Sequence, residues 1–186
     1  MIITISGNAG SGKDTVGKII AKKLNYKFYS MGDLRREKAK QRGMTIEEYN
    51  KLGETDKSTD IEVDEYQTEI GILEDNFVIV GRTSFYFIPQ SFKIFLDVDV
   101  KEAAKRIMSD KTRVGEKYKS INDAVKKLNK RNEMDDKRYK KYYKLDIFDK
   151  KHYDLLMDTT EITPDEAADN IINFIKNYNK TWDFSF

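Results

Sequence analysis

Several residue types are rare or missing in this chain of 186 residues. It has no cysteine, which excludes disulfides and cysteine-ligated metals and fits a reducing compartment. It has two prolines and a single histidine, His152, which lacks partner residues at metal-site or catalytic-triad spacing. No apolar run approaches the roughly 20 residues that a membrane-spanning helix needs. The amino terminus leads directly into a strand pattern, so no cleavable signal is expected. The length predicts a single domain with a full core, and the absences fit a protein of the cytoplasm without a membrane partner.

The chain also has no large excess of positive or negative charge. The chain has 34 Lys and Arg against 32 Asp and Glu, a formal net charge of +2, and the two signs are interspersed. Such a surface creates no long-range field for a polyanion, so no nucleic-acid partner is expected. We interpret the lysine-rich stretch at residues 137–144 as a solvated helix face.

The most informative segment that is present lies near the amino terminus. An apolar run, Ile2 to Ile5, precedes Gly7-Asn8-Ala9-Gly10-Ser11-Gly12-Lys13, and a helical pattern follows. This is the G-x-x-x-x-G-K spacing of a phosphate-binding loop, whose glycines turn successive backbone N–H groups toward an anion at a helix amino terminus. Lys13 adds a positive charge for the β- and γ-phosphates. The alternative is an ordinary strand–turn–helix without a ligand.

Strand and helix patterns alternate along the rest of the chain. Strands are predicted at residues 2–6, 26–29, 77–80, 94–96 and 153–157, and helices at 13–24, 33–41, 46–52, 60–73, 100–108, from 120 towards 143, and from Pro164 onward. Such alternation predicts an α/β fold with a parallel sheet covered on both faces. Ligands bind at the carboxyl ends of the strands in such sheets, and the Gly7–Lys13 loop, Arg82 and Asp97 all fall there.

Arginines narrow the choice among nucleotide-binding proteins. Arg131, Asp135 and Arg138 stand at i, i+4 and i+7, so their side chains share one helix face. Arg36 follows the second predicted strand, and Arg106 lies on the helix before a charged segment at residues 110–119. On the residues alone, the triplet on one helix face is equally compatible with a solvated surface.

These motifs occur along the chain in the same order as in the nucleoside monophosphate kinases, and the chain resembles that family. Among its members, it is most similar to the short, archaeal-like cytidylate kinases. The matching segments cover nearly the whole chain: 3–7 with 10–13, Ser30-x-Gly32-x-Leu34-x-Arg36-Glu37, 42–48, Asp60 with Asp64 and Gln67, Gly81-Arg82, 95–97, 131–139, 145–147 and 153–155. The resemblance implies a three-layer P-loop kinase fold, a five-stranded parallel sheet with helices on both faces. It also implies a single domain, 1–186, with a monophosphate-binding insert at about 33–73 and a lid at about 109–120.

The resemblance further implies an activity and a set of roles. ATP, with Mg²⁺, would give its γ-phosphoryl group to CMP or dCMP. Lys13, Arg106 and Arg131 would act on the transferring group. ATP would be bound by Gly7, Asn8, Ala9, Gly10, Ser11, Gly12, Lys13, Asp14 and Thr15, and the acceptor by Ser30, Arg36, Asp64, Arg82, Asp135 and Arg138. Such sites work by positioning and charge stabilisation, with little covalent participation of the protein.

The chain departs from the family pattern at two positions. Asp14 stands where a Ser or Thr hydroxyl usually binds Mg²⁺, and Val80 stands where an acid often precedes Gly-Arg. Our hypothesis is that Asp14 takes over part of the metal-holding role of the missing acid. The alternative is that Asp14 is simply a favourable acid in the first turn of a helix.

Other interpretations stay open at this stage. The acceptor could be AMP, UMP or a deoxynucleotide, and the sequence Gly12-Lys13-Asp14-Thr15 resembles that of some deoxynucleotide kinases. A nucleotide-binding module without catalysis and a nucleic-acid-binding protein are further candidates. We expect a monomer. The aromatic tail, Trp182, Phe184 and Phe186, is expected to pack on the domain or to mediate self-contact.

Overall fold

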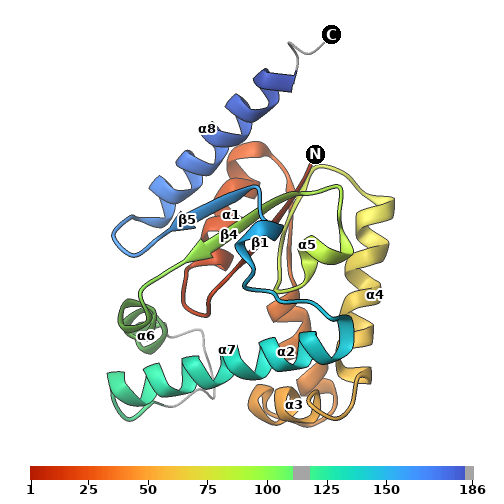
Figure 1. Ribbon diagram of the computed structural model, residues 1–186, viewed down its shortest axis with the longest axis vertical. Coiled ribbons are helices and arrows are strands. Elements are labelled where there is room, and N and C mark those ends of the chain that lie inside the picture. Colours follow the sequence, from red (N-terminus) through yellow and green to blue (C-terminus); the bar gives the residue numbers. More distant parts are fainter. Residues whose placement is uncertain (111–117, 183–186) are drawn as a thin grey trace.

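Five parallel strands form the centre of the structure, a computed structural model that describes residues 1–110 and 118–182 (Figure 1). Their order across the sheet is β2-β3-β1-β4-β5. The strands are β1 (Ile2–Gly7), β2 (Lys27–Ser30), β3 (Phe77–Val80), β4 (Phe92–Asp97) and β5 (Leu155–Asp158). The helices are α1 (Lys13–Leu24), α2 (Met31–Gln41), α3 (Ile46–Leu52), α4 (Ser58–Leu73), α5 (Ser84–Phe87), α6 (Val100–Ser109), α7 (Ile121–Tyr143) and α8 (Pro164–Trp182), with a 3₁₀ turn at Lys150–His152.

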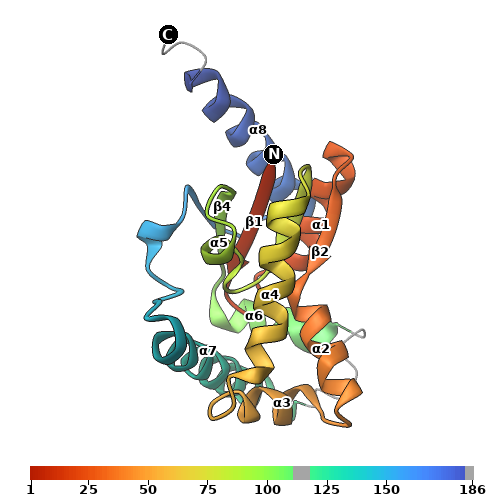
Figure 2. The ribbon, with the colours of Figure 1, turned by 90° about the vertical axis from the view of Figure 1, so that its right-hand side faces the viewer.

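Strand β1 is buried along its whole length because helices cover both faces of the sheet. Ile3 and Ile5 point to the face that α1 and α8 cover. Ile2 points to the opposite face, where Val63 and Ile70 of α4 pack. Figures 1 and 2 show these helix layers on either side of the strands. The predicted three-layer α/β architecture is confirmed.

All five predicted strands are present, with shifted boundaries. β5 begins at Leu155 rather than at residue 153 because the residues before it make other contacts: the Tyr153 hydroxyl donates to the Ile147 carbonyl, and the Asp154 carboxylate accepts from the Lys93 amide. α2 begins at Met31 rather than at residue 33, since Ser30 caps it by accepting a hydrogen bond from the Asp33 amide. The short helix α5 was not predicted.

The insert expected at residues 33–73 corresponds to three helices, α2, α3 and α4. In Figure 2, α2 and α3 lie below the sheet, and α4 runs up from them alongside the strands. Residues 111–117 of the predicted lid, and Phe184 and Phe186 of the aromatic tail, lie outside the described residues. His152 stacks against Phe85, with ring centroids 5.4 Å apart, so the described structure gives it a packing role.

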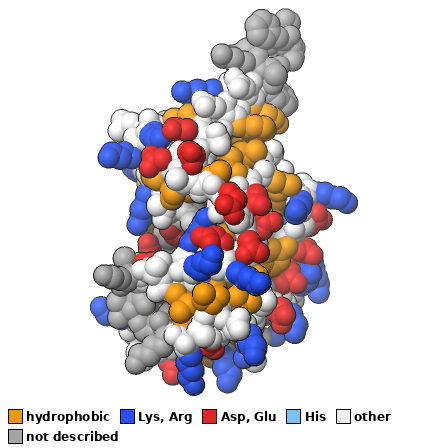
Figure 3. All heavy atoms as spheres, turned by 90° about the vertical axis from the view of Figure 1, so that its left-hand side faces the viewer, with side chains coloured by type: hydrophobic (Ala, Val, Ile, Leu, Met, Phe, Trp, Pro, Cys, Tyr) orange, Lys and Arg blue, Asp and Glu red, His pale blue; other side chains and the backbone are white. Residues whose placement is uncertain are grey.

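The surface carries mixed charge. On the face shown in Figure 3, Lys and Arg side chains are intermingled with Asp and Glu, and small hydrophobic patches lie between them. The lysines of the 137–144 stretch are exposed as predicted, but Arg138 and Tyr139 within it are buried. Among the described residues, no helix combines the length and apolar character that crossing a bilayer requires.

Candidate functional site

The loop between β1 and α1 is held against the end of β4. Gly7 has φ +147°, and a Cβ there would collide with the Leu96 carbonyl, so this close approach requires glycine. The Asn8 amide donates to the Leu96 carbonyl at 3.2 Å, and the Asn8 side chain donates to Asp97 at 2.6 Å. The side chain of Asn8 is therefore bonded to the carboxyl end of β4, and we expect it to position the loop.

The loop ends at the amino terminus of α1, which has no side-chain cap. Gly10 and Gly12 adopt φ values of +85° and +80°, which orient the loop so that it leads directly into the helix. Uncapped N–H groups and the helix dipole together favour an anion at this end. Lys13, the first residue of α1, adds its ammonium group. The predicted phosphate-binding loop thus has the geometry that its chemistry needs.

One cavity, of about 370 Å³, opens beside this loop. Residues 10–16 form one wall, and the segment after β5, including Thr159 and Pro164, forms another. Arg106 of α6 also lines this cavity, where its guanidinium donates to the Thr159 and Thr160 carbonyls at 2.8 and 3.0 Å. We call this space the donor cavity.

A second cavity, of about 80 Å³, lies between the loop, helices α2 and α4, and helix α7. We call it the acceptor cavity. Its charged lining residues are the cations Lys13, Arg35, Arg36, Arg82, Arg131 and Arg138 and the carboxylates Asp14, Asp60, Asp64 and Asp135. When all ten groups are ionised, the lining has an excess of two positive charges, which matches the charge of a phosphate monoester dianion.

The arginines are held by a buried network of ion pairs. Asp60 contacts Arg35 at 2.8 Å and Arg138 at 3.3 Å, and Asp135 contacts Arg138 at 2.8 Å and Arg82 at 3.0 Å. Burial opposes ionisation of Asp135, but the guanidinium groups of Arg82 and Arg138 outweigh it and lower the pKa of this carboxyl. In this closed conformation the network holds the guanidinium groups in place.

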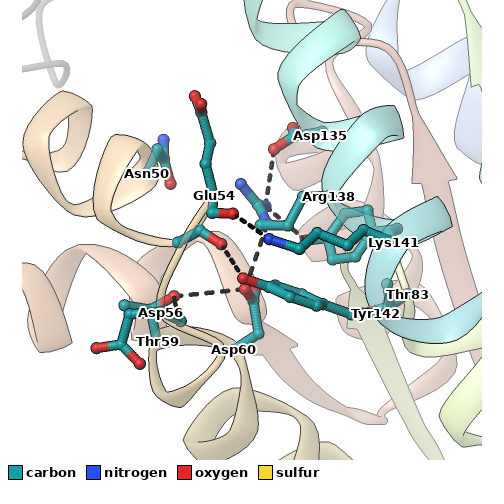
Figure 4. A network of polar contacts seen from close by, with 12 residues as sticks. Asn50, Glu54, Asp56, Thr59, Asp60, Thr83, Asp135, Arg138, Lys141 and Tyr142 are labelled. Carbon is teal, nitrogen blue, oxygen red and sulfur yellow. Dashed lines mark hydrogen bonds and ion pairs between the residues drawn. The ribbon is translucent and has the colours of Figure 1, made fainter.

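Helix α7 also contacts the corner between α3 and α4 directly (Figure 4). Lys141 donates to the Glu54 carbonyl, and the Tyr142 hydroxyl donates to the Gly53 carbonyl, both at 2.9 Å. Together with the Arg138–Asp60 pair, these bonds join α7 to the predicted insert. This closure explains why the acceptor cavity is small in this conformation.

Some guanidinium donors in this network have no partner among the described residues. Nη1 of Arg82 and Nη1 of Arg138 are buried without a hydrogen bond. Leaving a buried donor unsatisfied costs about 1–3 kcal/mol, and more for charged groups. An anion in the acceptor cavity would satisfy such donors, because arginine presents a fork that matches phosphate oxygens.

Asp64, on α4, also lines the acceptor cavity. Its carboxylate accepts hydrogen bonds from the Tyr143 hydroxyl and from the Gln67 side chain. Burial raises the pKa of Asp64 to about 6, although these two hydrogen bonds act in the opposite direction. Asp64 is therefore held as a hydrogen-bond acceptor for Tyr143 and Gln67, with a carboxyl pKa above its ordinary value.

The structure brings most of the predicted residues together, with three differences of placement. Arg36 lines the acceptor cavity, but its side chain is 42% exposed and pairs with Asp33, so it lies at the cavity mouth. Arg106 lies in the donor cavity, because α6 packs directly beside the loop and Gly10 approaches Ala103. Ser30 does not line the acceptor cavity, since its hydroxyl is bonded to Asp14 and to the Asp33 amide.

Sequence reasoning overlooked Arg35 as a site residue. Its side chain is only 12% exposed and is held by Asp60 and Asn50. A signal for it existed: Met31 and Ala39, four positions before and after Arg35, are both buried, so Arg35 lies on the inner face of α2. An arginine on the inward stripe of a helix indicates a buried charged site.

Comparison with known proteins gives a consistent result. Residues 2–161 match the sequence profile of the cytidylate kinase-like family. A cytidylate kinase from Methanococcoides burtonii is 34% identical over 160 residues, which is 86% of this chain and 88% of that protein. A structure of shikimate kinase from Bacteroides thetaiotaomicron has a TM-score of 0.66 at 16% identity, covering 95% of this chain and 98% of its own, which shows the shared fold.

A further relative is much longer. An S-adenosylmethionine-dependent nucleotide dehydratase from Lacinutrix mariniflava is 36% identical over 179 residues, which is 95% of this chain but 36% of that protein. The chain thus spans about a third of this relative's length.

Proposed function

Because the chain belongs to the cytidylate kinase-like family, we propose that it transfers the γ-phosphoryl group of ATP to CMP or dCMP, giving ADP and CDP or dCDP. The observation that carries this proposal is a pair of adjoining cavities. One contains a phosphate-binding loop, the other has excess positive charge and unpartnered guanidinium donors, and Lys13 lines both.

In the donor cavity, the N–H groups at the start of α1 would bind the β-phosphate. The ammonium group of Lys13 would interact with the negative charge of the phosphoryl group during its transfer. An oxygen of the acceptor phosphate attacks the γ-phosphorus, and the bond from that phosphorus to the β,γ-bridging oxygen breaks, so that ADP leaves. Arg131 lines the acceptor cavity, and Arg106 approaches from the donor side. Both would stabilise the charge of the transition state.

In the acceptor cavity, Arg82 and Arg138 would bind the monophosphate with Arg36 at the mouth, Asp135 would contact the sugar, and Asp64 would contact the base. A cavity of about 80 Å³ is below the roughly 300–1,000 Å³ of typical ligand pockets. Acceptor binding therefore requires the insert to move away from α7. Reclosure would then exclude water, the competing acceptor of the phosphoryl group.

Mg²⁺ is the usual partner of ATP in such enzymes, and it prefers oxygen ligands while retaining several waters. Among the described residues no cluster of three or more acidic or histidine side chains forms a metal cage. Asp14, which lines both cavities, fits a site completed by phosphate oxygens and water. When bound, the ion would neutralise charge on the phosphates. We propose Asp14 as its protein ligand.

The test is a coupled ADP-release assay with CMP, dCMP, UMP, AMP and dTMP as acceptors. We expect CMP or dCMP to give the highest kcat/KM. Arg131→Met should lower kcat by about a thousandfold, the order measured for transition-state arginines. Lys140→Met, an exposed position on the same helix, is the control and should retain activity. The proposal fails if no acceptor yields ADP above the ATPase background.

A further inference from the structure

Asp14 occupies a distinctive place between the two cavities. Among the residues that the structure describes, only Lys13 and Asp14 line both the donor and the acceptor cavity. The two side chains carry opposite charges at the point where two polyanionic substrates would meet. Lys13 has an evident role there, as a counter-charge for phosphate. The proposed binding of Mg²⁺ gives the Asp14 carboxylate one role, and its hydrogen bond with Ser30 points to a second.

The Asp14 carboxylate is bonded to the start of the acceptor-side helix. The Ser30 hydroxyl donates to Asp14 at 2.8 Å, and the same oxygen accepts from the Asp33 amide at 3.2 Å, which caps α2. A hydroxyl has one proton, so donation to Asp14 sets its orientation and leaves its lone pairs for the cap. One oxygen atom thus connects α1, which starts at the phosphate-binding loop, to α2.

Helix α2 continues from this cap into the acceptor cavity. It carries Arg35, which is held by Asp60, and Arg36 at the cavity mouth. A small shift of the α2 amino terminus therefore moves two guanidinium groups relative to the acceptor. The charge environment of Asp14 depends in turn on whether phosphates and their counter-ion occupy the donor cavity.

We propose that the Asp14–Ser30 hydrogen bond is the link through which occupancy of the donor cavity changes the affinity of the acceptor cavity. Both residues act as positioning residues in this role, and the inference rests on the proposed kinase function. An acid that only improved the first turn of α1 would have no need of a partner on α2. The bond joins residues 16 positions apart that belong to different sides of the site.

The measurement is the dissociation constant of CMP by isothermal titration calorimetry, with and without saturating ADP and Mg²⁺. The readout is the ratio of the two constants, which is independent of the absolute affinity. For the wild-type chain we expect a ratio of about 10, within the roughly 5–150-fold range of typical coupling. Ser30→Ala, which breaks the link but leaves Asp14 in place as the proposed Mg²⁺ ligand, should reduce the ratio to below about 2.

Two further variants separate coupling from stability. Ser30→Thr retains a hydroxyl that can donate and accept, and it should restore the ratio. Thr45→Ala removes the cap of α3 in the same insert, where the Thr45 hydroxyl accepts from the Glu48 amide. This variant should be less stable than wild type, yet keep the wild-type ratio.

The outcomes distinguish the two proposals. A wild-type chain that binds none of the monophosphates refutes the kinase function. A wild-type ratio near 1 refutes the link alone, and so does a Ser30→Ala chain in which CMP binding weakens equally with and without ADP and Mg²⁺. In that last case Ser30 would only shape the acceptor cavity.

Discussion

Asp60 provides the sharpest test of the buried network. Its carboxylate is 2% exposed and lies between Arg35 and Arg138, whose side chains are 12% and 2% exposed. Asp60→Asn keeps the size of the side chain but removes its charge. Arg35 then loses its carboxylate partner, while Arg138 keeps Asp135. The acceptor cavity gains one further unit of uncompensated positive charge.

Removing one partner of a buried ion pair costs about 3–5 kcal/mol. We expect a loss of about 3 kcal/mol, at the lower end of that range, because Asp135 still compensates Arg138. In a protein of this size, about 1 kcal/mol corresponds to roughly 2–4 °C in Tm. The Asp60→Asn variant should therefore melt roughly 6–12 °C below wild type.

Urea denaturation and calorimetry would measure this loss, with Asp169→Asn as the matched control. Asp169 pairs with Lys23 at 2.8 Å, but both side chains are substantially exposed, so its removal should cost about 0–1 kcal/mol. Inorganic phosphate should raise the Tm of the Asp60→Asn variant more than that of wild type, because the cavity is more cationic. Equal stability losses in the two variants would refute the network argument.

Two further predictions concern Asp64 and the loop glycines. Burial raises the pKa of Asp64 to about 6, so the native state binds more protons than the unfolded state between pH ~4 and 6, and wild-type stability falls as pH rises through that window. Asp64→Asn should therefore be more stable than wild type by about 3 kcal/mol at pH 8, and this difference should vanish towards pH 4. Urea titrations at both pH values would measure it, and equal stability of the two proteins at pH 8 would contradict the raised pKa of Asp64. Gly7→Ala should lower the free energy of unfolding by about 3 kcal/mol or more, because the new Cβ meets the Leu96 carbonyl. Gly12→Ala has open space around it, so it should lower the free energy of unfolding only by the backbone strain of about 1–2 kcal/mol. Similar losses for the two alanine variants would show that the close approach at Gly7 is tolerated.

Much of the site could be predicted because its signals are local. The phosphate-binding loop is one continuous segment, and its glycines and Lys13 are recognisable from spacing alone. The pairing of Arg131, Asp135 and Arg138 on one face follows from the helical period. The alternation of strands and helices predicted the layers of the fold, since each pattern reflects which side chains must be buried.

Other features depend on contacts between distant segments. In the sequence, only the helical period of α2 separates Arg35 from Arg36, and it is the packing of α2 against α3 and α4 that buries one and exposes the other. Arg106 faces the donor cavity because α6 packs beside the loop. The bond between Asp14 and Ser30 exists because β2 ends next to the start of α1.

The sequence by itself determined the layered fold and the phosphate-binding loop, because period and spacing are properties of neighbouring residues. Only the tertiary structure decided which charges face which cavity and which carboxylate holds which arginine. Those choices depend on how helices pack over the sheet, since a charged side chain lies within the protein only where another segment supplies its partner.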